Sequence, residues 1–146
     1  MWTEILNWIL KHFSANPALY ERSSPKIRIK TGDVSLDMAT NEVHFKGLKP
    51  GTWVTSVADT GSMDPLIDIG MMVILEPIRD IHDLIVGDII CYQKPGTPCL
   101  ILHRIIKIYE DSTGWWCQAK GDNSVSKDPG WIETSWVRYI LRGILH

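Results

Sequence analysis

The feature that most limits how this chain can fold is the regular interruption of short apolar or alternating stretches by glycine and proline. Pro-Gly and Gly-Asp pairs recur from residue 31 onward, and they separate stretches that are too short for stable helices. Many of these stretches alternate apolar and polar residues, as half-buried strands do. The sequence therefore predicts a mostly β domain, with strands at 26–30, 34–38, 42–46, 53–57, 71–75, 87–92, 99–109, 115–120 and 137–145 and a short helix or turn at 132–136.

The first 25 residues follow a different pattern. Apolar side chains recur at helical spacing, which predicts a short amphipathic helix within 2–13; they are Trp2, Ile5, Leu6, Ile9 and Phe13. A helix of under four turns is marginal alone, so we expect this face to pack on protein, either its own domain or a partner. It lacks the basic polar face that anionic membranes select, so any membrane contact is expected to be peripheral. Residues 14–25 are expected to be a linker, giving an N-terminal segment at 1–25 and a β domain at 26–146.

Composition excludes several classes of function. The 146 residues suit one domain with a real core, and a net charge of −2 gives no reason to expect nucleic-acid binding. No apolar stretch approaches the length of a membrane span and no secretory signal is visible, so we expect a soluble protein, cytoplasmic or part of a larger assembly. The three cysteines show no metal-ligand spacing, and no metal or cofactor is expected. Cys91 and Cys99 could approach each other across a hairpin, but an odd number of cysteines favours a reducing compartment.

One serine has candidate partners for nucleophilic catalysis. Ser62 follows Gly61, which permits a tight turn that exposes the hydroxyl. A nucleophilic serine needs a base, a group that orients the base, and donors for an oxyanion. His103 is the candidate base, and Asp122 and Asp128 are the candidate orienting acids. Thr60, two residues before the serine, is a candidate oxyanion donor.

These residues lie in four motifs whose order resembles that of type I signal peptidases. The motifs are Gly-Ser-Met-Asp-Pro at 61–65, Gly-Asp-Ile-Ile at 87–90, Leu-His-Arg-Ile-Ile-Lys at 102–107, and Lys-Gly-Asp-Asn at 120–123 followed by Asp128. The resemblance covers residues 53–143. It is strongest to the endoplasmic-reticulum and archaeal branch, which uses histidine where most bacterial enzymes and the LexA-type repressors use lysine. The resemblance implies a fold of several coiled β-sheets.

The resemblance also implies a role for each candidate residue. Ser62 would be the nucleophile and His103 the base, while Thr60 and the Ser62 backbone N–H would bind the oxyanion. Two acids six residues apart are typical of the branch, and Asp122 and Asp128 keep that spacing. We favour Asp128 as the orienting acid and assign Asp122 a supporting role. A polypeptide cleaved after small residues is the implied substrate.

The chain departs from the family pattern at two places, and each motif alone has an ordinary explanation. Gly70 is followed by Met71 where the family has Gly-Asp, and no transmembrane anchor precedes the serine. A serine in a Gly-Ser turn is usually only a turn residue. A histidine among apolar strand residues, such as His103, is usually a satisfied core or edge residue. The prediction of a site depends on all four motifs occurring together in this order.

Three functions follow from this interpretation. The first is a serine endopeptidase that binds its substrate as an added β-strand. The second is a structural or interaction module, for example a viral particle component or a subunit of a complex, which keeps the fold. The third is a LexA-type self-cleaving regulator. It is disfavoured because histidine replaces lysine and because residues 1–52 contain no helix-turn-helix pattern.

Overall fold

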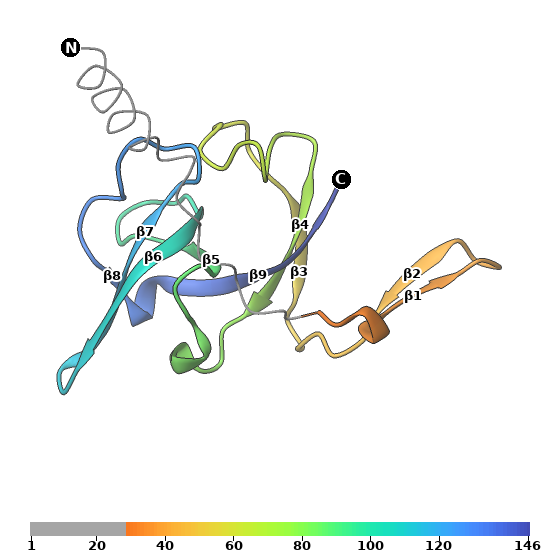
Figure 1. The fold of residues 1–146 in the computed structure, drawn as a ribbon, viewed down its shortest axis with the longest axis horizontal. Helices are drawn as coiled ribbons and strands as arrows, with labels where there is room; N and C mark the ends of the chain where they lie inside the picture. The colour runs from red at the N-terminus through yellow and green to blue at the C-terminus, as the bar shows by residue number, and fades with distance from the viewer. Residues whose placement is uncertain (1–28) are drawn as a thin grey trace, which may run out of the picture.

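The computed structural model describes residues 29–146, which form two antiparallel sheets (Figure 1). The larger sheet has seven strands in the order β3-β4-β9-β5-β6-β7-β8, and the smaller one is the hairpin β1–β2. The strands are β1 (Val34–Asp37), β2 (Glu42–Phe45), β3 (Trp53–Ser56), β4 (Met72–Pro77), β5 (Ile89–Tyr92), β6 (Ile101–Asp111), β7 (Gly114–Lys120), β8 (Ile132–Glu133) and β9 (Val137–Leu145). The described residues also include three single-turn 3₁₀ helices: η2 (Thr31–Asp33) directly before β1, η3 (Ile81–Asp83) between β4 and β5, and η4 (Thr134–Trp136) between β8 and β9.

Strand β9 joins the two halves of the larger sheet. It pairs with β4 through Met72–Pro77 and with β5 through Ile90–Tyr92, and a register shift interrupts each pairing. Such irregularities bend strands and increase their twist, and the sheet is accordingly curled in Figure 1. The half containing β3 and β4 is thereby held against the half containing β5, β6 and β7.

Two apolar cores support the larger sheet, and β5 contributes residues to both. Under β5, β6 and β7 the core includes Ile90, Tyr92, Ile105, Trp115, Cys117 and Ile132. Under β3 and β4 it includes Met63, Ile67, Val73, Leu75, Ile89 and Cys91. Strand β7 alternates buried and half-buried residues along its whole length, as its sequence pattern predicts. The second core holds the segment that follows Ser62, because Met63 and Ile67 belong to it.

The β1–β2 hairpin extends away from the rest of the molecule (Figure 1). Leu36 lies opposite Val43 and Val34 lies opposite Phe45, so these four apolar side chains share one face. Val34, Leu36 and Val43 are exposed. A two-stranded hairpin is marginally stable at best, so this apolar face is a candidate contact surface.

The prediction of a mostly β fold is confirmed, with three differences. Instead of several sheets, a single curled sheet carries seven strands, because β9 pairs on both of its edges. The strand expected at 26–30 is absent from its described part, residues 29 and 30, which lead directly into η2. Residues 132–136 form the two-residue strand β8 followed by η4. The helix expected at 2–13 lies outside the described residues.

Two further features bear on the expectations from composition. Within residues 29–146, no helix is long and apolar enough to cross a membrane. Cys91, Cys99 and Cys117 are all free thiols, so the possible Cys91–Cys99 disulfide is not formed. Burial raises the pKa of Cys91 to about 11, and burial together with the charge of Asp128 raises that of Cys117 to about 12.

Candidate active site

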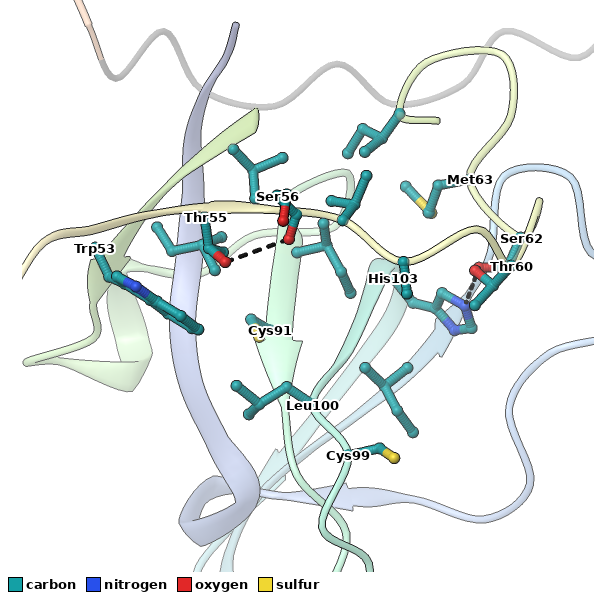
Figure 2. Close-up of a pocket in the computed structure, with 17 residues that line it drawn as sticks. Trp53, Thr55, Ser56, Thr60, Ser62, Met63, Cys91, Cys99, Leu100 and His103 are labelled. Atoms are coloured by element: carbon teal, nitrogen blue, oxygen red, sulfur yellow. Dashed lines mark hydrogen bonds between the residues drawn. The ribbon is translucent and has the colours of Figure 1, made fainter. Parts of the chain in front are cut away.

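Ser62 and His103 come from different halves of the sheet and meet at its curl. Ser62 lies in the loop between β3 and β4, and His103 lies on β6, opposite Ile90 of β5. Ser62 Oγ is 3.1 Å from His103 Nε2, and Figure 2 shows the two side chains facing each other. This distance puts the candidate base within hydrogen-bond reach of the serine hydroxyl.

Asp128 occupies the other side of the imidazole ring. Its two carboxylate oxygens lie 2.9 and 2.8 Å from His103 Nδ1. Because a carboxylate only accepts hydrogen bonds, this contact selects the tautomer with the proton on Nδ1. The remaining nitrogen, Nε2, can then accept the proton of the Ser62 hydroxyl. The side chains of His103 and Asp128 are each about 12% exposed, so the pair is largely shielded from water.

Asp122 binds Arg104, the residue that follows His103 on β6. Its carboxylate accepts two hydrogen bonds from Arg104, from Nε at 2.8 Å and from a terminal nitrogen at 2.7 Å. Arg104 also donates to the backbone oxygen of Gly87 at 2.7 Å. Asp122 therefore ties the loop at 121–128 to β6 and to the turn before β5, which fits the supporting role predicted for it.

The loop that carries Asp128 also holds the backbone around the serine. Asn123 donates from its backbone N–H to the Ser62 oxygen and from its side-chain amide to the Gly61 oxygen, both at 2.9 Å. Gly61 adopts a φ of 61°, a left-handed conformation that glycine takes without strain. With both carbonyls fixed in this way, the Ser62 side chain is turned toward His103.

Thr60 lies beside the serine hydroxyl. Its Oγ1 is 3.3 Å from Ser62 Oγ, so the two hydroxyls are adjacent in the loop. The predicted role of Thr60 and of the Ser62 N–H as oxyanion donors stays a prediction, as do the catalytic roles of Ser62, His103, Asp128 and Asp122. Among residues 29–146, no group of three histidine, cysteine or acidic side chains is arranged to hold a metal ion.

A largely apolar pocket of about 530 Å³ opens beside Ser62 (Figure 2). Its walls come from β3 with the residues that follow it, from Val73 and Leu75 of β4, from Cys91 of β5, and from residues 99–103, which lead into β6. In Figure 2 the Ser62–His103 pair and Trp53 lie at opposite ends of the pocket. Strand β3 pairs only with β4, so no strand of residues 29–146 covers its other edge. An extended segment lying in the pocket could pair with this edge.

Several side chains that shape the site were not predicted from the sequence. Asn123 and Arg104 lie inside the motifs that were identified, but nothing in the motifs indicated their contacts. Tyr92 had no sequence signal at all: its hydroxyl donates to Asp128 at 2.8 Å from a completely buried position on β5. The phenol meets the acid because β5, β6 and β7 are neighbours in the sheet and the Asp128 N–H binds the Ala119 oxygen of β7.

Comparison with known proteins gives one partial similarity. No family model matches the chain. Over 79 residues, which are 54% of this chain, it is 28% identical to signal peptidase I W of Bacillus subtilis (strain 168). The matched region spans only 41% of that protein. This distant similarity supports a relationship to peptidases.

Proposed function

We propose that this protein is a serine endopeptidase in which Ser62 is the nucleophile, His103 the general base and Asp128 the orienting acid. The observation that supports this most directly is the continuous contact from Ser62 Oγ through the imidazole to Asp128. The partial similarity to a signal peptidase gives independent support for peptide hydrolysis.

The proposed reaction proceeds through an acyl-enzyme. Ser62 Oγ attacks the scissile carbonyl carbon while its proton moves to His103 Nε2, and the Nδ1–H bond to Asp128 stabilises the imidazolium that forms. The Ser62 N–H and the Thr60 hydroxyl donate to the oxyanion. The imidazolium then gives its proton to the leaving amine. Water, activated by the same imidazole, hydrolyses the ester and restores the serine hydroxyl.

The pocket suggests how the substrate would bind. An extended peptide would add to the edge of β3 opposite β4 and place side chains in the apolar pocket beside Ser62. Charged side chains there would lose their hydration without gaining a partner, so they would be rejected. Small residues before the cut are expected from the resemblance to signal peptidases.

Covalent labelling tests the proposal without knowledge of the substrate. A fluorophosphonate should label each intact protein molecule once, as seen by the mass of a single adduct. Peptide mapping should place this adduct on Ser62. Ser62→Ala should take no label. Ser56→Ala is the control and should label like the wild type: Ser56 lines the same pocket but lies on β3, outside the serine loop. Labelling should increase with pH across the range in which histidine loses its proton. A folded protein that takes no label at Ser62 between pH 6 and 9 would contradict the proposal.

The alternative function is an interaction module that keeps this fold. The exposed apolar face of the β1–β2 hairpin favours it, since Leu36 is 60% exposed on a hairpin that extends from the molecule. Under this alternative, Ser62→Ala would leave binding to a partner intact, and Leu36→Ser with Val43→Ser would abolish it. The labelling experiment separates the two functions.

A further inference from the structure

A buried phenol contacts the acid of the candidate active site. Tyr92 Oη donates to Asp128 Oδ2 at 2.8 Å, and the same oxygen lies 2.8 Å from His103 Nδ1. Tyr92 has no exposed surface and belongs to the apolar core under β5, β6 and β7. A phenylalanine would fill this apolar position equally well, and a buried hydroxyl is costly unless it is hydrogen-bonded. The position of the hydroxyl therefore calls for an explanation beyond packing.

We infer that Tyr92 is a positioning residue that sets the basicity of His103 by sharing the negative charge of Asp128. This inference rests on the proposed function for its consequence in catalysis. The hydrogen bond from the Tyr92 phenol draws part of the negative charge of Asp128 toward the phenol. Less negative charge then faces the imidazole of His103. The imidazolium is then less stabilised, and His103 stays neutral, and able to accept the Ser62 proton, at lower pH.

Tyr92 affects the charge of Asp128 rather than its position, because other contacts keep Asp128 in place. The Asp128 backbone N–H donates to the Ala119 oxygen at 2.9 Å, and both carboxylate oxygens lie within 2.9 Å of His103 Nδ1. Removing the Tyr92 hydroxyl should therefore leave the carboxylate in position with its charge undivided. Burial and the nearby Asp128 raise the pKa of Tyr92 far above its ordinary value, so the phenol stays a neutral donor over the whole working range.

Other ionisable groups lie near the imidazole and the loop that carries its acid. Burial and the charge of Asp128 raise the pKa of Cys117 on β7, so its thiol stays neutral. Arg104 on β6 and Asp122 in the loop bind each other through two hydrogen bonds and so balance in charge. Lys94 also lies near this loop, because its Nζ donates to the Pro129 backbone oxygen at 3.2 Å. None of these groups is altered in Tyr92→Phe, so the variant changes only how the charge of Asp128 is shared.

The test compares Tyr92→Phe with Tyr109→Phe. The control removes an equivalent hydrogen bond, because Tyr109 Oη donates to Asp111 at 2.8 Å, but on the exposed far end of β6. Nuclear magnetic resonance follows the His103 ring signals as pH changes, assigned by their loss in His103→Gln. We expect the titration midpoint of His103 to rise by about half a pH unit or more in Tyr92→Phe, and to stay at the wild-type value in Tyr109→Phe. In the pH profile of kcat/KM, the acid limb of Tyr92→Phe should shift to higher pH by the same amount.

Three outcomes decide the matter. A midpoint that stays or falls in a folded Tyr92→Phe variant overturns the inference, even if the protein hydrolyses peptides. A midpoint that rises in a protein that takes no label at Ser62 supports the charge sharing and contradicts the proposed endopeptidase. If Tyr92→Phe does not fold, 3-fluorotyrosine placed at residue 92 keeps the hydroxyl and makes it a stronger donor. The His103 midpoint should then fall, and a rise or no change would overturn the inference.

Discussion

At the scale of single residues, Gly121 shows how closely the acid loop packs on the serine. A Cβ built on Gly121 would lie 2.5 Å from the Ser62 backbone oxygen and 3.0 Å from His103 Nε2. The first of these atoms belongs to the backbone and cannot rotate away. Any side chain at this position must therefore displace either the serine or the loop.

We expect Gly121→Ala to lower kcat/KM for peptide hydrolysis, or the rate of labelling at Ser62, by at least about 100-fold, because displacement by about 1 Å misaligns the reacting atoms. Gly32→Ala is the control, since a Cβ on Gly32 would meet nothing within 4 Å and its backbone φ is unstrained. Circular dichroism should show both variants folded. Equal rates in the two variants would mean that the loop can move away from Ser62 without loss.

The candidate site was predictable from the sequence only where a motif carried the residue. Ser62, His103 and Asp128 were identified because their motifs occur in a characteristic order, and Asp128 was preferred to Asp122 on weaker grounds. Asn123 and Gly121 were visible in a motif, but their roles depend on the contact between two loops about 60 residues apart along the chain. Tyr92 was not predictable, because a tyrosine in an apolar strand is ordinary and only strand pairing directs its hydroxyl to Asp128.

At the scale of elements, Arg104 holds three segments together. From β6 it binds the Asp122 carboxylate through two parallel hydrogen bonds and the Gly87 oxygen through a third. Arg104 and Asp122 are 12% and 5% exposed, so their interaction is shielded from water. The planar guanidinium allows all three contacts at once, which a lysine ammonium on a flexible stem cannot reproduce.

We expect Arg104→Lys to destabilise the protein by about 2 kcal/mol, because it loses buried charge-assisted hydrogen bonds while keeping the charge. Urea unfolding measures this change. Arg79→Lys, at an exposed arginine, should unfold like the wild type. Hydrogen exchange should also show faster exchange of the backbone amides at 121–124 in Arg104→Lys alone. Identical unfolding of the two variants would contradict the bridging role of Arg104.

The strands themselves were predictable, and their neighbours in the sheet were not. Glycine and proline marked most strand ends to within two residues, because these residues act on local backbone geometry. The expected strand at 26–30 had the right alternation, but its described residues 29 and 30 have no strand partner. The placement of β9 between β4 and β5 depends on packing between distant residues, which local patterns do not encode.

At the scale of the whole molecule, Glu76 links distant parts of the chain through a buried charge. It has no exposed surface, it binds Arg142 of β9, and it accepts from the Lys49 backbone N–H at 3.3 Å. Burial alone would raise the pKa of Glu76, but the hydrogen bonds from Arg142 and Lys49 outweigh it and hold the pKa below its ordinary value. A carboxylate with a depressed pKa contributes stability above the pKa it has when unfolded, and that stability is lost as pH falls through the folded value.

We therefore expect Glu76→Gln to unfold more easily at pH 7, by about 3 kcal/mol, because it leaves Arg142 charged and without its anionic partner. Its stability should also fall less steeply than that of the wild type as pH drops below about 4.5. Glu42→Gln, at a largely exposed carboxylate, is the control and should keep the wild-type profile. Urea unfolding at each pH measures the free energy of unfolding. If it falls equally with pH in the wild type, Glu76→Gln and Glu42→Gln, this role of Glu76 is contradicted.

The position of β9 between the two halves of the sheet has a consequence for the order of events during synthesis. The serine loop follows β3, the histidine lies on β6, and both strands precede the strand that binds their halves together. A growing chain thus holds Ser62, His103 and Asp128 before it holds the strand that joins the two halves. Any cleaving activity would be withheld until β9 is made and docked, which protects the nascent polypeptide and its neighbours from premature cutting.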